Sequence, residues 1–422
     1  MLGTPFFDWQ WYLACLLLVL SLPIRIFFRL RRNRALNLIL ALLGLWLIFG
    51  YNGFGYVRRL TAESHPPVPI SFWAFSDFRQ TPENVLRDLS DAGSVIYLDV
   101  PGRPFEGERG RALADGLRRL NEHDIDVYLA PTASNFLSTP TRQEWIENVW
   151  AAAEFVEREG LTNVRGVIGD AEHPLRVPFD ILGLERAQVE ATTDDLASLL
   201  ANVPRRYPDL RIGVTTNWPQ LVDGMDGDDD LAVTLSSPVD PPDGWAFVNL
   251  MTYSSYLPSA WRAYYVYLLE TQMAHRYPDA EVSHLIGIVG YGFPWEPLLD
   301  FDDLVRDARL SRALGVCEIA VFQLDGALQV FGEDFVRRLI ESVNCDSCAP
   351  VLVPFSRPAS LVVYGIAIVD AVLDLRGWGG VLWIVFSAWL ISRQKSEASA
   401  KFLPPTKASL LDVIANSTLD ER

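Results

Sequence analysis

Lysine is missing from the central part of this chain. Residues 60–350 contain 22 arginines and no lysine against 46 aspartates and glutamates, which amounts to a net charge of −24. An acidic segment of this kind repels a polyanion, so DNA and RNA are excluded as expected partners. The lysines of the chain, Lys395, Lys401 and Lys407, all lie near its C-terminal end.

Cysteine is scarce as well, with four in 422 residues. Cys317 lies in a stretch that is predicted to be a buried strand, where a thiol usually serves as a small apolar side chain. Cys345 and Cys348 form a Cys-x-x-Cys pair without a second pair or a histidine cluster. This argues against a zinc site and leaves a local disulfide or two free thiols. No metal and no cofactor is therefore expected.

Long apolar runs are confined to the two ends of the chain. Residues 11–28 and 35–50 are each close to the ~20 apolar residues that a membrane-spanning helix needs. Five arginines between Arg25 and Arg34 place the connecting loop in the cytoplasm by the positive-inside rule. Residues 351–372 and 377–392 are apolar again and predict one or two further helices.

These runs divide the chain into four parts. We expect a membrane region with two helices at 1–59, a folded domain at 60–350, a second membrane region at 351–395 and a polar tail at 396–422. The charge pattern places the domain on the extracytoplasmic side of a cell membrane. The sequence does not indicate an oligomeric state.

The central domain alternates short β-branched or aromatic runs with amphipathic stretches, which is typical of βα units over a parallel sheet. Eight such units in about 290 residues predict an α/β fold of the (β/α)8 or TIM-barrel class. The expected strands lie at 69–75, 94–100, 125–131, 164–170, 210–216, 245–252, 284–290 and 316–323.

The fourth strand ends in two carboxylates, Asp170 and Glu172. Because strand side chains alternate, both should point the same way, into the mouth of the barrel where active sites of this fold lie. A neighbouring negative charge and partial loss of water should raise the pKa of one of them. A carboxyl group that stays protonated near neutral pH can donate a proton to a leaving glycosidic oxygen.

Polar and aromatic residues follow several other strands and would share the same mouth. Aromatic rings there can stack on sugar faces, and polar groups can bind sugar hydroxyls. The substrate-binding candidates are Trp73, Asp99, Asn217, Trp218, Met251, Tyr291, Trp295, Gln323 and Asp325.

Two segments resemble glycoside hydrolase family 18, the chitinase family. The segment from Arg165 to Glu172 is similar to the family's Asp-Gly-x-Asp-x-Asp-x-Glu motif, and the segment from Val248 to Tyr253 is similar to its Asn-x-Met-x-Tyr motif. The resemblance covers residues 66–343 and none of the predicted membrane segments.

The resemblance implies a role for each matching position. Glu172 would be the general acid, and Asp170 would orient and stabilise the acetamido group of the substrate as that group attacks the anomeric carbon. Tyr253 would hydrogen-bond the acetamido oxygen. Such substrate-assisted catalysis needs neither a protein nucleophile nor a metal.

The chain departs from the family motifs at four places. The first two aspartates of the motif on the fourth strand are Arg165 and Ile168 here, and the aspartate that follows the Met-x-Tyr motif is Ser254. The tryptophan of the eighth strand is replaced by Phe322 or Gln323. Without an acid at Ile168, Asp170 lacks the partner with which it would share a proton, so its pKa should be set differently.

Three functions remain open at this point. The first is a membrane-anchored glycosidase that acts on an amino-sugar-containing polysaccharide. The second is a retaining glycosidase with Glu172 as the acid and Glu296 as the nucleophile, which requires a carboxyl separation of about 5–5.5 Å. The third is a catalytically silent barrel that binds glycans or a protein partner.

Overall fold

The described part of the chain comprises 57–61, 65–76, 78–102, 104–131, 139–171, 186–219, 244–276, 281–289, 297–345, 348–356, 358–360, 362–363 and 365–366 of a computed structural model. These residues belong to the compact unit Met1–Asp370, and the second unit, Ala371–Arg422, lies outside them. Within the described ranges no helix is both long and apolar enough to cross a membrane. The predicted membrane segments at 11–28, 35–50 and 377–392, and much of the one at 351–372, fall outside those ranges.

Strands and helices alternate along the described chain. The elements are β1 (Val57–Leu60), β2 (Ile70–Ala74), α3 (Glu83–Asp91), β3 (Val95–Asp99), α4 (Gly107–Glu122), β4 (Asp126–Ala130), α5 (Thr139–Glu159), β5 (Val164–Ala171), α6 (Arg186–Arg206), β6 (Arg211–Asn217), β7 (Phe247–Met251), the 3-10 turn η2 (Ser254–Tyr256), α9 (Ser259–Arg276), β8 (Val282–Gly287), α10 (Phe301–Leu314), β9 (Ile319–Phe322), α11 (Leu324–Phe331), α12 (Phe335–Val343) and β10 (Val351–Pro354).

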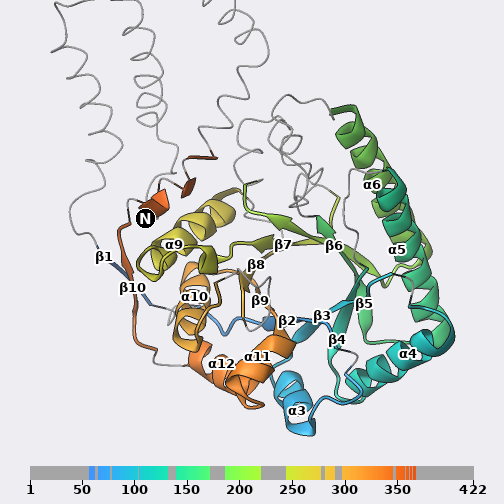
Figure 1. Cartoon of the computed structure of the whole chain (residues 1–422), viewed down its shortest axis with the longest axis horizontal. Helices are drawn as coiled ribbons and strands as arrows, with labels where there is room; N and C mark the ends of the chain where they lie inside the picture. Colours follow the sequence, from blue (N-terminus) through green and yellow to red (C-terminus); the bar gives the residue numbers. More distant parts are fainter. Residues whose placement is uncertain are drawn as a thin grey trace, which may run out of the picture. The chain divides into compact units, whose positions relative to one another are not determined.

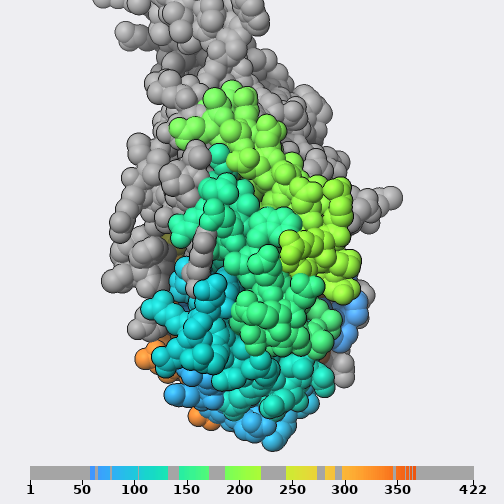
Figure 2. All heavy atoms as spheres, turned by 90° about the vertical axis from the view of Figure 1, so that its right-hand side faces the viewer, coloured from blue at the N-terminus to red at the C-terminus, as the bar shows by residue number. Residues whose placement is uncertain are grey.

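Strands β2 to β9 form a closed parallel barrel in sequence order, because β9 pairs with β2. The predicted (β/α)8 barrel is therefore confirmed, and each predicted strand agrees with an observed one to within three residues at either end. The helices surround the strands (Figure 1), and α4, α5 and α6 cover one face with a continuous layer of side chains (Figure 2). The carboxyl ends of the strands form the mouth of the barrel, and their amino ends form its base.

Both faces of the barrel strands are buried, as expected for a parallel sheet that is covered by helices. Outward side chains such as Phe72, Leu98 and Val214 belong to the core between strands and helices. Inward side chains form a second core, in which the rings of Tyr97 and Tyr128 stack at 5.7 Å and the ring of Phe247 lies 4.6 Å from Tyr128.

A glycine on β6 makes room for this aromatic filling. A Cβ atom at Gly213 would come within 2.2 Å of the Phe247 ring, which is far closer than van der Waals contact allows. The interior of the barrel is thus packed with rings up to the level at which the strands end.

The helices carry the expected local signals at their ends. The Asp300 side chain accepts a 2.7 Å hydrogen bond from the Asp303 backbone N–H and so caps the first turn of α10. Gly315 ends the same helix in a left-handed conformation, with φ of 80°, which glycine adopts without steric cost.

The prediction that Cys317 lies in a buried strand was wrong. Strand β9 begins only at Ile319, and Cys317 is an exposed residue in the turn between the end of α10 and that strand. The Cys317 thiol turns back toward β8 and donates to the Val282 carbonyl oxygen at 2.9 Å. A thiol in this position resembles an apolar strand residue in the sequence. Cys345 and Cys348 form a local disulfide, one of the two states that the sequence left open.

The apolar run that begins at Val351 does not start as a membrane helix. Its first four residues form β10, which pairs in antiparallel register with β1, so the folded unit extends beyond 60–350 at both ends. Val351 and Val353 are buried against α9, whereas Leu352 is exposed. Alternate burial of this kind identifies a strand, although the amino acids alone resemble the start of a transmembrane segment.

Candidate active site

Two carboxylates meet at the mouth of the barrel. Asp99 is the last residue of β3, and Asp170 is the penultimate residue of β5. The strand between them, β4, ends at Ala130, which pairs with Asp99 and points inward. Because Ala130 carries only a methyl group, β4 places no large side chain between the two carboxylates.

The pKa of Asp170 is raised from its ordinary value of 3.8 to about 7. Burial is the main cause, since it disfavours the charged form, and the negative charge of Asp99 adds to it. The sequence predicted that a neighbouring carboxylate would raise a pKa here. The partner that the structure provides is Asp99, and Glu172 lies outside the described residues.

Thr215 is the neighbour of Asp170 on the next strand, because the two residues pair between β5 and β6. It is buried, and its hydroxyl has no hydrogen-bond partner among the described residues. This residue was not among those predicted from the sequence, although side chains alternate along β6 and Thr215 lies two positions before Asn217. Its hydroxyl can donate to a polar ligand bound beside Asp170.

Aromatic rings form the floor below the carboxylates. Trp73 is 4% exposed, and its ring stacks on Tyr97 at 5.7 Å. Ile168, which replaces an aspartate of the motif that this segment resembles, is fully buried in the same interior core, and Met251 also belongs to it. Trp73 and Met251, both predicted to bind substrate, thus lie within the floor rather than on the rim. The Trp73 indole N–H lacks a described partner.

Tyr253 follows β7 and stands at the same mouth, half-buried. Its ring lies 5.9 Å from that of Phe322 at the end of β9. A Cβ atom at Gly287, on the strand between them, would come within 3.2 Å of the Tyr253 ring and 2.9 Å of the Phe322 carbonyl oxygen. Glycine at this position therefore allows Tyr253 to lie over the end of β8.

A buried carboxylate on α10 holds the segment after Tyr253. The Ser254 hydroxyl donates to Asp307, and Arg306 donates to the same carboxylate at 2.6 Å. Burial raises the pKa of Asp307, while Arg306 and the hydrogen bond from Ser254 act in the opposite direction. Ser255 accepts a 3.2 Å hydrogen bond from the Ile288 backbone N–H, so η2 is tied to β8 as well. No sequence motif pointed to Asp307, because it reaches Ser254 from a helix fifty residues away.

The other predicted positions are spread over the rim. Asn217 ends β6 and pairs with Met251, whereas the ring of Trp218 packs edge-on against Tyr265 of α9 at 6.0 Å. Gln323 is buried, with its side-chain oxygen lacking a described partner. Asp325 accepts a 2.7 Å hydrogen bond from the Phe75 backbone N–H and so fixes the loop after β2. Tyr291, Trp295 and Glu296 lie outside the described residues.

Among the described residues, no group of three or more histidine, cysteine or acidic side chains is placed to hold a metal ion. The chemistry that the described part of the mouth offers is that of two carboxyl groups, a phenol and several buried polar atoms. These groups can exchange protons, donate hydrogen bonds and stabilise positive charge.

Similarity to known proteins is limited to weak likeness to solved structures. No family model and no curated protein matches the sequence. Among solved structures, an endo-β-1,4-mannanase from Thermotoga petrophila is similar, with a TM-score of 0.48 and 11% identity over 68% of this chain and 78% of that one. The PgaB (BpsB) glycoside hydrolase domain from Bordetella bronchiseptica has a TM-score of 0.45 and 10% identity over 67% of this chain and 100% of that domain.

A family 18 chitinase from Pseudoalteromonas aurantia is similar at a TM-score of 0.43, with 12% identity over 65% of this chain and 99% of that one. Similarities at this level carry no information on function, and the barrel fold itself is established by the order of the strands.

We predict that Asp170→Asn changes stability in a pH-dependent way. The folded state holds the Asp170 proton up to a pKa of about 7, whereas the unfolded chain releases it near 3.8. Folding stability therefore falls as the pH rises from about 4 to about 7, and Asn removes this loss. In thermal denaturation the variant should match the wild type near pH 4 and exceed it near pH 8. An equal difference in Tm at both pH values would contradict the raised pKa.

We also predict that Ser254→Ala lowers the free energy of unfolding by about 1–3 kcal/mol, because it removes a hydrogen bond to a buried carboxylate. Ser198→Ala is the matched control, since Ser198 is exposed on α6. Denaturant titration of both variants measures the effect. If both lose the same small amount, Asp307 does not hold the segment that carries Tyr253.

Proposed function

We propose that this protein is a membrane-anchored glycoside hydrolase that cleaves an amino-sugar-containing polysaccharide by substrate-assisted acid catalysis. The observation that carries the proposal is the pairing of Asp170, with a pKa of about 7, with Asp99 at the mouth of the barrel. The motif resemblance supplies the roles of the residues around this pair. The membrane anchoring follows from the apolar runs at both ends of the sequence.

The electrostatics of the pair favour this reaction. Asp170 resists ionisation because it is buried and because Asp99 beside it carries a negative charge. A ligand that develops positive charge beside them relieves this repulsion, as a sugar does when the bond at its anomeric carbon breaks. Stabilisation that grows as charge develops lowers the barrier, whereas equal binding of substrate and transition state would not.

The proposed first step moves one proton and exchanges one bond. The acetamido oxygen of the substrate forms a bond to the anomeric carbon while the bond from that carbon to the leaving oxygen breaks. Glu172 gives its proton to that oxygen. In its ionised form Asp170 accepts a hydrogen bond from the acetamido N–H and balances the positive charge of the resulting ring, and the Tyr253 hydroxyl donates to the acetamido oxygen.

In the second step Glu172 takes a proton from a water molecule, whose oxygen bonds to the anomeric carbon. The bond from that carbon to the acetamido oxygen then breaks. Glu172 ends protonated, and the anomeric configuration is retained because the carbon is inverted twice. The substrate, water and these side chains supply every atom and proton that the two steps require.

The test is Glu172→Gln, which removes the proton donor and keeps the side-chain size. We expect hydrolysis of chitotetraose to fall at least about a thousandfold, towards the upper part of the range that a general acid contributes. Thermal stability and the Kd for the intact sugar should stay close to those of the wild type. Glu190→Gln, which changes an exposed carboxylate on α6, is the matched control and should leave turnover unchanged.

Two outcomes would overturn the proposal. Equal turnover by Glu172→Gln and the wild type would show that Glu172 is not the acid. If the wild type binds chitotetraose and releases it intact after long incubation, the protein is a glycan-binding barrel instead.

A further inference from the structure

The two chain segments that lead to the predicted membrane regions leave the barrel at the same place. Strands β1 and β10 pair with each other in antiparallel register, with Val57 opposite Pro354. The N-terminal apolar region precedes Val57 directly, and the C-terminal apolar run continues after Pro354. Both connections therefore start from one end of a single two-stranded ribbon.

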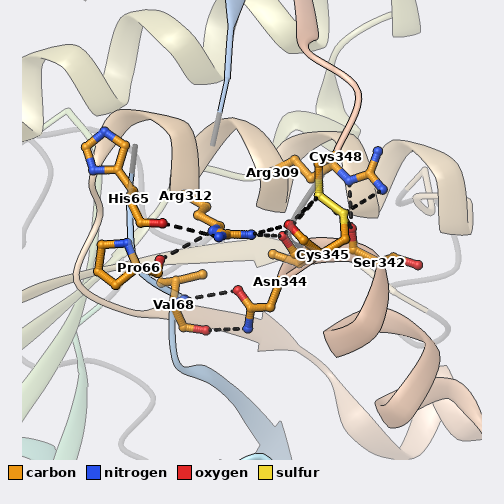
Figure 3. The surroundings of a disulfide bond; sticks show 10 residues. His65, Pro66, Val68, Arg309, Arg312, Ser342, Asn344, Cys345 and Cys348 are labelled. Carbon is orange, nitrogen blue, oxygen red and sulfur yellow. Dashed lines mark hydrogen bonds between the residues drawn. A yellow bond between two sulfur atoms is a disulfide. The ribbon is translucent and has the colours of Figure 1, made fainter. Parts of the chain in front are cut away.

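The opposite end of the ribbon is fixed at the base of the barrel (Figure 3). The Arg312 guanidinium binds four backbone carbonyl oxygens, those of His65 and Pro66 before β2, that of Val343 at the end of α12 and that of Cys345 after it. The Asn344 side chain exchanges two hydrogen bonds of 3.0 Å with the backbone of Val68. The Cys345–Cys348 disulfide closes the turn that leads from α12 into β10.

From this base the ribbon runs along α9 toward the mouth. Helix α9 starts at the mouth, a few residues after Tyr253, and descends to the base because it returns the chain from β7 to β8. Phe355, directly after β10, packs edge-on against Tyr264 in the second turn of α9 at 5.1 Å. Ser360 hydrogen-bonds the Tyr264 hydroxyl. By residue 360 the chain has thus reached the level of the upper turns of α9.

Strand β1 of the ribbon is held against the same helix. The Arg58 guanidinium lies 4.8 Å from the centre of the Tyr267 ring and hydrogen-bonds its hydroxyl. Arg58 comes one residue after Val57, at the mouth end of the ribbon. The N-terminal connection is therefore fixed to α9 one turn below Tyr264.

The rim of the mouth carries exposed apolar side chains on three loops. Phe75 follows β2, Tyr256 follows β7 and Leu298 lies in the connection after β8, and these side chains are 47%, 49% and 45% exposed. Such residues are suited to the interfacial layer of a bilayer, where aromatic and aliphatic groups contact acyl chains and tyrosine hydroxyls remain in water. The negative charge of the domain gives no attraction to anionic lipids, so contact would depend on the anchors and these side chains.

We infer that the mouth of the barrel opens toward the bilayer from which the flanking segments emerge, and that its substrate is a glycan carried on a lipid in that bilayer. The orientation follows from the path of the ribbon and from the three rim residues. The substrate class rests on the proposed function. A disulfide at the base accords with a domain outside the cytoplasm, since disulfides persist in oxidising compartments.

The first experiment measures orientation without reference to catalysis. The full-length chain, with Cys15→Ser and Cys317→Ser, is labelled with a fluorophore at Ser259→Cys, at the mouth end of α9, or at Glu122→Cys, at the base end of α4. Both positions are exposed. In liposomes of phosphatidylcholine and phosphatidylglycerol, a nitroxide on the lipid headgroups should quench the Ser259→Cys label at least twice as strongly. Equal quenching, or stronger quenching at Glu122→Cys, overturns the inferred orientation.

The second experiment measures substrate class in the same proteoliposomes. Chitotetraose linked to phosphatidylethanolamine should be hydrolysed with a kcat/KM at least tenfold higher than that of free chitotetraose. Equal values overturn the assignment of a lipid-carried substrate. If neither sugar is cleaved while the quenching pattern holds, the proposed hydrolase function fails and the orientation stands.

Discussion

A sheet that closes into a barrel has to fill its own interior, and in this protein the filling is aromatic. Trp73, Tyr97, Tyr128 and Phe247 occupy the space up to the level at which the strands end, and Gly213 leaves room for the last of these rings. The rings make the interior of the barrel apolar. Asp170 is the penultimate residue of one of the strands that enclose this interior, and its burial there is the main reason that its pKa is raised.

The two carboxylates at the mouth illustrate how a fold produces a chemical property. Neither Asp99 nor Asp170 is unusual as a residue, but the strand order places them on either side of β4, which ends in alanine. Burial and like charge then act in the same direction on Asp170. A positive charge that develops beside the two carboxyl groups relieves the repulsion between them, and such a charge develops when a glycosidic bond breaks. The buried hydrogen bond between Ser254 and Asp307 contributes by fixing the segment that presents Tyr253.

Much of the fold could be predicted from the sequence because the barrel strands are short apolar runs between clear turn and capping signals. Alternation within the fourth strand was enough to point to Asp170. The partnership with Asp99 could not be predicted, since it depends on the side-chain size at Ala130 and on the order of strands in three dimensions. Asp307 was missed for a similar reason, because it lies on a helix and carries no motif. The first four residues of the run at Val351 form a strand that the sequence did not separate from a membrane segment, because both kinds of segment share the same composition.

The central claim is that burial and the charge of Asp99 raise the pKa of Asp170 to about 7. A direct measurement is the titration of its carboxyl group by 13C NMR in protein labelled at aspartate, assigned by comparison with Asp170→Asn. The account predicts a midpoint of about 7 in the wild type. In Asp99→Asn, where one of the two causes is removed, the midpoint should move to lower pH. A wild-type midpoint near the ordinary value of 3.8, unchanged in Asp99→Asn, would contradict it.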